Sequence, residues 1–343
     1  MIWIDYRYSR WWSKSGVSAS KPSMPMIAFI GVRVSWLILA ENSLFDRLAD
    51  SATSLAPCNI SSSSRRSNSA LTSCPNNWII VIDPEDNLSL QNILNRKENA
   101  MPNQVVVCAH RGASGTHPEN TIPAFVEAAA LGCEMVEFDV RATADGHLVI
   151  LHDETVDRTT DGTGKIWQLS FAETRRLNAD AGHDAHAGVQ IPTLHETLDC
   201  LPGKMQLNMH VYPGPSDGDT IVDQVCQTIK VRNLYATAFI AGSDEVMQLV
   251  IDTDAKVRRC LLGSQNRVEI YAQLAKQMGC CNVQPLHRIV SKEFCDKAHH
   301  LGLFIHPFYA DDQAEMTRLI ECGVDGILTN YPQRLIRLRK TLL

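Results

Sequence analysis

The sequence feature that most limits the fold is an alternation of short apolar runs with amphipathic helical patterns, which starts at Val105 and continues to the last residues. Strand patterns separated by helical patterns are typical of β-α units, which build a parallel sheet. Eight such units within roughly 240 residues predict an α/β fold, a (β/α)8 barrel of the TIM type. An open doubly wound sheet is the alternative, but the chain lacks the Gly-x-Gly-x-x-Gly turn of the dinucleotide-binding form.

The eight expected strands are short apolar runs, at residues 105–109, 135–140, 205–211, 236–240, 257–262, 281–284, 303–306 and 326–329. Asp145 and Gly146 predict a hairpin turn after the second strand, and residues 148–151 then return as a short strand that leads to His152. The residues that follow are rich in loop signals, with one helix expected near 171–177 and capped by Ser170. We therefore expect an insertion of about residues 141–190 after the second strand.

Residues 1–100 differ from the rest, because they hold few sustained periodic segments and include the run Ser-Ser-Ser-Ser-Arg-Arg-Ser at 61–67. We expect a low-order or non-native extension here, followed by a barrel domain at 101–343. The apolar run Met26–Ala40 contains Arg33 and is shorter than the roughly 20 residues that span a bilayer. Because basic residues precede this run, a signal or anchor segment is the alternative, and membrane contact is expected only there.

The charges are unevenly distributed along the chain. The composition, 45% hydrophobic and 20% charged, is that of a globular protein, and the formal net charge is −6. Residues 1–100 hold ten Lys and Arg against eight Asp and Glu, whereas the remaining residues hold 22 against 30. The barrel region thus lacks the basic surplus that binds a phosphate backbone, so nucleic acid is not an expected partner.

The eleven cysteines form no Cys-x-x-Cys pair. Several of them stand in apolar strand or helix patterns, where cysteine packs as a small hydrophobic residue: Cys108, Cys133, Cys226, Cys260 and Cys322. Free thiols indicate a reducing compartment, so we expect a cytoplasmic protein. If residues 26–40 act as a signal or anchor, the protein is instead membrane-associated or exported. The sequence does not indicate the oligomeric state.

Glu137 and Asp139 lie two residues apart in an otherwise apolar strand, so their side chains point to the same face. Burying two like charges side by side is costly without a cation, so the pair predicts a divalent metal site. The alternative is a half-exposed polar face. His110 and His210 also stand at the C-terminal ends of expected strands, where barrel enzymes carry out chemistry. Four histidines fall away from this end and are expected at the surface: His195, His287, His299 and His300.

A series of short motifs runs between residues 103 and 335. In order they are His110-Arg111-Gly112, Pro118-Glu119-Asn120-Thr121, Glu137-Phe138-Asp139, His152-Asp153, Ile191-Pro192-Thr193-Leu194 and Gly323-Val324-Asp325-Gly326-Ile327. Each motif alone is weak evidence, but their order resembles the glycerophosphodiester phosphodiesterase family. The resemblance implies a TIM barrel enzyme that hydrolyses a small glycerophosphodiester to sn-glycerol 3-phosphate and an alcohol.

The resemblance also implies a cofactor and an acid/base pair. In that family, carboxylates hold a divalent ion, and two histidines act as general base or nucleophile and as general acid. Carried over to this chain, Glu137 and Asp139 are ligands of one metal ion, Mg²⁺, Ca²⁺ or Mn²⁺. His110 and His152 are then the pair that moves protons.

Three further polar residues of the motifs receive roles by the same resemblance. Arg111 would bind the phosphate, since its planar fork matches phosphate oxygens. Glu119 and Asp153 would orient Arg111 and His152 rather than contact the substrate.

The third expected strand departs from the family pattern Asn-x-Glu-x-Lys, because this chain reads Asn-Met-His-Val-Tyr at 208–212. His210 can still donate a lone pair to a metal, and imidazole favours Mn²⁺ or another borderline ion over Ca²⁺. Tyr212 can hydrogen-bond a phosphate oxygen but brings no positive charge. Two alternatives stay open: a phospholipase D-like enzyme on lysolipids or sphingolipids, with Phe308 and Tyr309 as an apolar ramp, and a catalytically weakened barrel that only binds a phosphodiester.

Overall fold

The computed structural model describes residues 105–342, except 216, 218 and 263–266, together with the backbone of three short strands nearer the N-terminus. These strands, β1 (Ile27–Ile30), β2 (Ala70–Ser73) and β3 (Ile79–Ile82), form a sheet in the order β1-β3-β2. The chain divides into two units, 1–99 and 100–343. The expectations of a low-order extension and of a signal or anchor fall mostly on residues outside the described part.

Eight parallel strands form the second unit's sheet: β4 (Val106–His110), β5 (Met135–Ala142), β7 (Gln206–Val211), β8 (Ala238–Gly242), β9 (Arg258–Leu261), β10 (Asn282–Val283), β11 (Phe304–Ile305) and β12 (Gly326–Thr329). Their order in the sheet is β11-β10-β9-β8-β7-β5-β4-β12. Backbone hydrogen bonds from Asp325 N to Ile305 O and from Leu328 N to Pro307 O, both 3.0 Å, join its two ends. The strands thus form a nearly closed barrel, which confirms the predicted fold.

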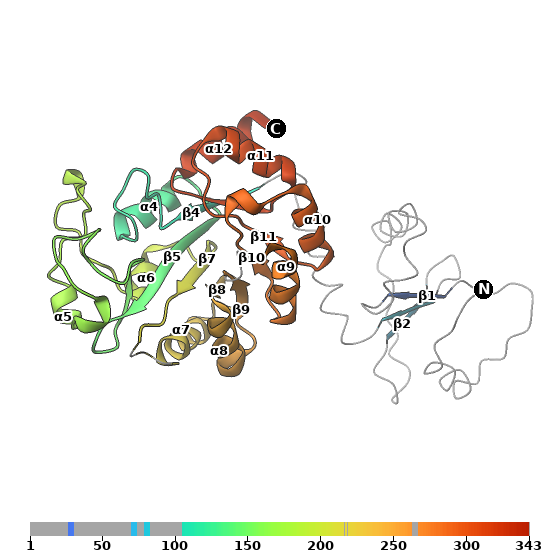
Figure 1. Ribbon diagram of the computed structural model, residues 1–343, viewed down its shortest axis with the longest axis horizontal. Coiled ribbons are helices and arrows are strands. Elements are labelled where there is room, and N and C mark those ends of the chain that lie inside the picture. The colour runs from blue at the N-terminus through green and yellow to red at the C-terminus, as the bar shows by residue number, and fades with distance from the viewer. Residues whose placement is uncertain are drawn as a thin grey trace, which may run out of the picture. The chain divides into compact units, whose positions relative to one another are not determined.

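A helix follows each barrel strand: α4 (Ile122–Ala130), α6 (Leu194–Cys200), α7 (Thr220–Val231), α8 (Asp244–Asp254), α9 (Val268–Gln277), α10 (Lys292–His300), α11 (Gln313–Cys322) and α12 (Pro332–Leu342). These helices surround the strands (Figure 1). Short polar side chains begin several of them by accepting a hydrogen bond from the backbone N–H three residues on, which satisfies a donor of the first turn: Thr193, Ser243, Ser291 and Asp312.

Some strand boundaries differ from the prediction by about two residues. The strand expected at 236–240 begins only at Ala238, because the backbone N–H of Ala238 still bonds to Leu234 O at 2.8 Å in the turn after α7. The strands expected at 281–284 and 303–306 are reduced to two residues each. Each is closely followed by a proline, Pro285 and Pro307, which has no N–H to extend the ladder.

The insertion begins as an extension of β5. β6 (Leu148–Ile150) pairs antiparallel with the end of β5, and Gly146 turns the hairpin at φ +80°. Three short helical segments follow, at η1 (Ile166–Gln168), α5 (Phe171–Thr174) and η2 (Asp184–His186). The side chains inside the insertion form a small core of their own, made of Val149, Leu151, Val156, Ile166, Ala179 and Ile191. This core fixes the segment that follows β6, which carries His152.

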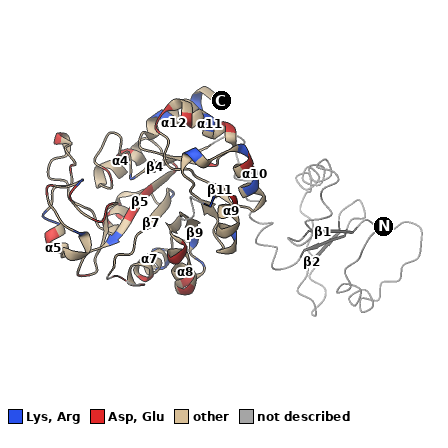
Figure 2. Cartoon of the chain, in the orientation of Figure 1, with Lys and Arg blue, Asp and Glu red and all other residues tan. Residues whose placement is uncertain are grey.

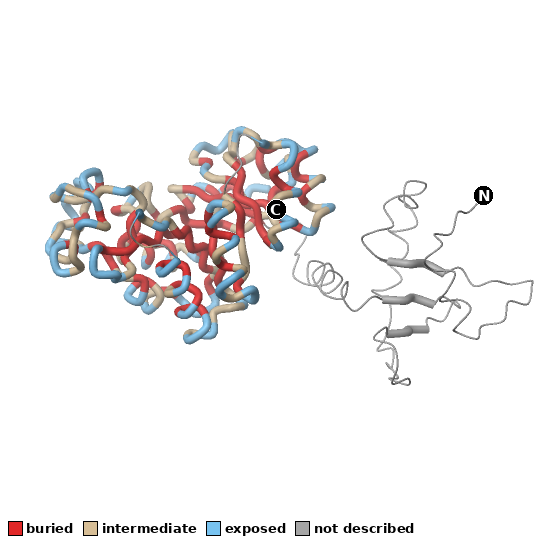
Figure 3. Tube along the Cα trace, turned by 60° about the horizontal axis from the view of Figure 1, so that its bottom comes forward, coloured by how far each residue is buried: buried red, intermediate tan, exposed pale blue. Residues whose placement is uncertain are grey.

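The barrel itself has an outer and an inner core, and Figure 3 shows the buried strands inside the more exposed helices. In the outer core, Phe125 of α4 packs edge to face on Phe138 of β5 with ring centroids 5.9 Å apart. Replacing such a buried Phe by Ala costs about 3–5 kcal/mol. The inner core is small, with Cys108, Met135, Phe239, Ala241, Cys260 and Leu328. Above it, the strand positions at the mouth of the barrel are polar.

The distribution of charges and the burial of the cysteines can be compared with the sequence predictions. Lys and Arg are interspersed with Asp and Glu along the outer helices (Figure 2). No helix among the described residues is long and apolar enough to cross a bilayer. The nine cysteines of this part of the chain are free; Cys108, Cys133, Cys226 and Cys260 are buried as expected, whereas Cys322 is only partly buried.

Two of the four histidines predicted at the surface are exposed, His195 and His300. His287 and His299 are only partly exposed. His287 Nδ1 lies 2.6 Å from Glu315 Oε1, and His299 Nε2 lies 2.9 Å from Asp325 Oδ2. Carboxylates from distant parts of the sequence therefore hold these two side chains in place. A local sequence pattern cannot indicate such partners.

Candidate active site

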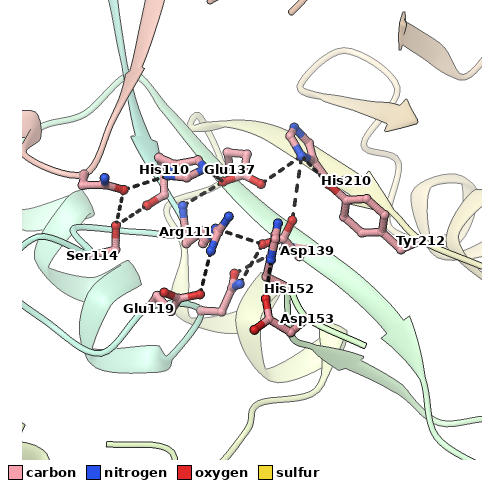
Figure 4. A network of polar contacts seen from close by, with 12 residues as sticks. His110, Arg111, Ser114, Glu119, Glu137, Asp139, His152, Asp153, His210 and Tyr212 are labelled. Carbon is pink, nitrogen blue, oxygen red and sulfur yellow. Dashed lines mark hydrogen bonds and ion pairs between the residues drawn. The ribbon is translucent and has the colours of Figure 1, made fainter. Parts of the chain in front are cut away.

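The two acidic residues of β5 lie inside the mouth of the barrel (Figure 4). Glu137 is 0% exposed and Asp139 1%, so the alternative of a half-exposed polar face is wrong. In the sheet register, Glu137 lies opposite His110 of β4, and Asp139 lies opposite His210 of β7. Glu137, Asp139 and His210 each offer one ligand atom within 4.8 Å of the others. The three predicted metal ligands are thus brought together.

His210 lies between Gln284 and the two carboxylates. Its Nε2 is 3.0 Å from Gln284 Oε1, and in the tautomer with the proton on Nε2 this nitrogen donates to that oxygen. In that tautomer Nδ1 faces Glu137 Oε1 at 3.2 Å and Asp139 Oδ1 at 3.8 Å with a lone pair. Burial lowers the pKa of His210 to about 4, so the imidazole is neutral near pH 7.

The remaining oxygens of this cluster fit a metal ion. Neither Glu137 Oε1 nor Asp139 Oδ1 accepts a hydrogen bond from any described residue, although both atoms are buried. Burial, and then the charge of Asp139, raises the pKa of Glu137 well above its ordinary value. Two carboxylate oxygens thus converge on the imidazole Nδ1, and neither oxygen has a hydrogen-bond donor among the described residues. A divalent cation would satisfy all three atoms.

His110 ends β4 and is held by Asn330, which directly follows β12. Its Nδ1 lies 2.7 Å from Asn330 Oδ1, while Asn330 Nδ2 donates to Asp311 Oδ2 at 2.6 Å. The amide orientation of Asn330 is therefore fixed, and His110 Nδ1 must be the donor. Burial, with a smaller effect of Arg111, lowers the pKa of His110 to about 4. The neutral ring leaves Nε2 free to accept a proton, 3.9 Å from Glu137 Oε2.

Arg111 lies in the left-handed region at φ 56°, which is uncommon for a residue with a side chain. This conformation lets its backbone N–H donate to Glu137 Oε2 at 2.8 Å. Its Nη1 donates to Glu119 Oε1 at 2.8 Å, and its Nε lies 3.5 Å from Asp139 Oδ2. Burial disfavours the charged guanidinium, but the charges of Asp139, Glu119 and Glu137 outweigh it and raise the pKa of Arg111.

His152 reaches the mouth from the insertion and pairs with Asp153. Its Nδ1 donates to Asp153 Oδ1 at 2.6 Å, which leaves Nε2 available. Its ring meets Tyr212 edge to face, with centroids 6.0 Å apart. Tyr212 in turn places its hydroxyl 3.5 Å from His210 Nδ1. The insertion and β7 therefore meet at this histidine.

Arg158 of the insertion joins the two outer carboxylates and was not found from the sequence. It donates to both oxygens of Asp153, at 2.6 and 3.0 Å, and to both oxygens of Glu119, at 2.8 Å each. Although burial acts in the opposite direction, these bonds and Arg111 lower the pKa of Glu119 to about 2. Hydrogen bonds from Arg158 likewise hold the pKa of Asp153 well below its ordinary value. Arg158 thus links Arg111 to His152 through two ionised carboxylates.

Asn120 also contacts the site, at φ 57°. The next residue, Thr121, occupies the N-cap position of α4. Asn120 instead donates from Nδ2 to Asp139 Oδ2 at 2.8 Å. Asn tolerates the left-handed backbone conformation better than most residues, and here that conformation turns the side chain of Asn120 toward β5. The residue type Asn was therefore the one sequence signal that could have indicated this contact.

A cavity of about 560 Å³ opens onto these groups. Charged and histidine side chains line it: His110, Arg111, Asp139, Arg141, His152, Glu154 and His210. Apolar and aromatic residues also line it, among them Val211, Pro213, Val246, Leu262, Phe308 and Tyr309. Tyr309 stacks on the ring of His110 with centroids 5.3 Å apart and is 47% exposed. The cavity therefore accepts a molecule with a charged end and a less polar end.

Known proteins are similar to this chain in sequence and in fold. Residues 110–334 match the model of the glycerophosphoryl diester phosphodiesterase family. A glycerophosphodiester phosphodiesterase of Caldanaerobacter subterraneus subsp. tengcongensis is 33% identical over 238 residues, which cover 68% of this chain and 98% of the relative. A second relative with that name, from Bacillus subtilis, is 27% identical and covers 70% and 88%.

Solved structures agree with the fold. An Oleispira antarctica phosphodiesterase in complex with sn-glycerol 3-phosphate superposes with a TM-score of 0.63 at 23% identity, covering 68% of this chain and 96% of the other. A glycerophosphodiester phosphodiesterase from Agrobacterium tumefaciens gives a TM-score of 0.61 at 24% identity, with coverages of 68% and 100%. With the family model matched from His110 through most of the barrel, this chain belongs to the glycerophosphoryl diester phosphodiesterase family.

Proposed function

We propose that this protein hydrolyses glycerophosphodiesters to sn-glycerol 3-phosphate and an alcohol with the help of one divalent ion. The observation that carries the proposal is the convergence of Glu137, Asp139 and His210 beside two imidazoles in one cavity. The relatives named for this activity, and the related structure that holds sn-glycerol 3-phosphate, support the substrate class.

The residues divide the chemistry between them. A phosphodiester resists hydrolysis because its negative charge repels a nucleophile and its alkoxide leaving group needs a proton. A divalent ion held by Glu137, Asp139 and His210 would supply positive charge to the phosphate oxygens. Arg111, on the same side of the cavity, orients the phosphate.

The two histidines take the proton transfers. His110 is buried and neutral with Nε2 unprotonated, so it acts as the base or nucleophile at phosphorus. His152 lies nearer the rim, with its side chain 36% exposed, where the alcohol leaves toward solvent. With both ring nitrogens protonated and Nδ1 held by Asp153, it donates the Nε2 proton to the leaving oxygen as the phosphorus–oxygen bond breaks. Water supplies the hydroxyl that ends on phosphorus and the proton that restores His152.

We further propose that Mn²⁺ or another borderline ion is preferred over Ca²⁺. The support is the neutral imidazole of His210 with Nδ1 directed at the two carboxylates. Calcium prefers an all-oxygen shell, whereas imidazole is a good ligand for first-row transition ions.

A lysolipid is a second candidate substrate for the same reaction centre. The apolar residues that line the cavity include Phe308, Leu262 and Val246, together with the half-exposed Tyr309. A chain-bearing alcohol or acyl group would bury apolar surface there, at about 25 cal/mol per Å² removed from water.

Turnover of glycerophosphocholine and of a lysophosphatidylcholine by the purified full chain tests these proposals. After chelation, we expect activity to vanish, and Mn²⁺ to restore it better than Ca²⁺. The matched variant His210→Glu should shift the preference toward Ca²⁺ or Mg²⁺, because its site is all oxygen. Binding of both substrates without release of choline from either under any added ion would contradict hydrolysis, and would instead indicate a weakened, binding-only barrel.

A further inference from the structure

The phosphate of a diester needs cationic partners, and two guanidinium groups line the cavity, those of Arg111 and Arg141. Arg111 is already engaged with carboxylates. Its Nη1 bonds to Glu119, its backbone N–H bonds to Glu137, and its Nε lies 3.5 Å from Asp139. Much of the positive field of Arg111 is therefore cancelled before a substrate arrives.

Arg141 is held differently. It stands near the end of β5, two residues after Asp139, and is only 8% exposed. Its Nε donates to the backbone oxygen of His152 at 2.9 Å, and its Cζ lies 4.9 Å from the centroid of the Tyr212 ring. These contacts fix the plane of the guanidinium without neutralising its charge.

The outer nitrogens of Arg141 are left for a ligand. Among the described residues, neither Nη1 nor Nη2 has a hydrogen-bond acceptor, and neither atom is fully enclosed. A buried arginine whose fork lacks partners is costly, since a desolvated charge needs an opposite charge or acceptors. Arg141 lines the same cavity as His110, His152, Asp139 and His210. An anionic ligand in this cavity would supply the acceptors that Nη1 and Nη2 lack.

We propose that Arg141 is a second phosphate-binding residue, whose Nη1 and Nη2 bind two non-bridging oxygens of the substrate. This inference rests on the proposed function and adds to it. With Nε used by His152, the end of the guanidinium remains as a bidentate fork of the kind that matches phosphate. Through the same Nε bond, Arg141 holds the backbone of His152, so phosphate and proton donor are placed by one side chain.

The experiment compares binding of two probes, sn-glycerol 3-phosphate and inorganic phosphate, to the Mn²⁺-loaded full chain and its variants. Arg141→Gln keeps an amide that can donate to His152 but removes the charge. Losing a charge-assisted hydrogen bond should raise the Kd of both probes roughly 10- to 100-fold. Affinity for Mn²⁺ should change much less than probe affinity, because Arg141 forms no hydrogen bond or ion pair with Glu137, Asp139 or His210, although the charge of Asp139 acts on it.

A charge-relocation variant separates binding from folding. Tyr212 lies against the Arg141 guanidinium, so a Lys at 212 should bring an ammonium to the same part of the cavity. We expect Tyr212→Lys to recover a large part of the probe affinity in the Arg141→Gln background. The matched control is Arg176→Gln, which removes a charge from an exposed position of the insertion and should change nothing.

The outcomes separate the two proposals. If wild type turns over substrate but Arg141→Gln binds both probes as tightly as wild type, the role of Arg141 is refuted while the proposed function stands. If wild type releases no sn-glycerol 3-phosphate, yet Arg141→Gln binds both probes more weakly than wild type does, the anion site stands and the hydrolytic function is refuted. Wild type that binds neither probe would overturn the Arg141 site itself.

Discussion

Two pairs of carboxylates lie at the same barrel mouth, and their surroundings are opposite. Glu137 and Asp139 are enclosed, and each keeps a buried oxygen without a donor in the described structure. Glu119 and Asp153 are partly exposed, and the single side chain of Arg158 donates to all four of their oxygens. The inner pair therefore has oxygens that a bound cation would neutralise, whereas the oxygens of the outer pair already accept hydrogen bonds from Arg158 and hold neighbouring side chains in position.

The largest expected effect comes from neutralising the inner pair. Asp139→Asn should abolish tight Mn²⁺ binding and lower kcat on the order of 10³-fold, because the ion contributes several kcal/mol to charge stabilisation. The matched variant in the outer pair, Asp153→Asn, should keep its metal affinity. Metal titration of both proteins by calorimetry, with kinetics alongside, checks the contrast. Equal metal loss in the two variants would remove the distinction between the pairs.

The next effect is on stability in acid and arises from the outer pair. The pKa of Glu119 falls from an ordinary 4.5 to about 2 in the folded chain. The carboxylate is thus stabilised by folding above pH 4.5, and this stabilisation is lost as the pH falls toward 2. It amounts to on the order of 3 kcal/mol. Urea unfolding between pH 6 and 2 should show this loss in wild type and a flatter profile in Glu119→Gln; superimposable profiles would show that Glu119 is not held in this way.

The smallest expected effect comes from Arg158 itself. Arg158→Gln should lower kcat about 10- to 100-fold, the range typical of residues that orient catalytic groups, because Arg111 and His152 lose their shared support. Affinity for Mn²⁺ should not change, since Arg158 does not contact the inner pair. Arg158→Lys, which cannot bridge two carboxylates in the same plane, should recover little. A variant with unchanged kcat would limit Arg158 to a structural role in the insertion.

Local patterns predicted the inner pair well. Two acids spaced by one residue on an apolar strand share a face whatever the rest of the chain does, and parallel strands of a barrel end at one mouth. His110 and His210 followed from the same rule. The eight strands were found for the same reason, although turns and prolines shifted some of their ends.

Contacts across long separations could not be predicted. Arg158 lies in a loop without periodicity, and its partner Glu119 is 39 residues away. Gln284, which fixes the tautomer of His210, is 74 residues from it, and Asn330 is 220 residues from His110. Such pairs depend on which strand ends become neighbours after the barrel closes, and no single segment carries that information.

The hairpin of β5 and β6 has a consequence for how this enzyme can diversify. The three proposed metal ligands belong to the barrel strands, whereas His152 stands in a segment that follows the hairpin and has its own small core. If His152 is the proton donor, a different insertion would reposition that donor while the strands of the proposed metal site stay unchanged. Grafting insertions between relatives would then be a way to change head-group selectivity.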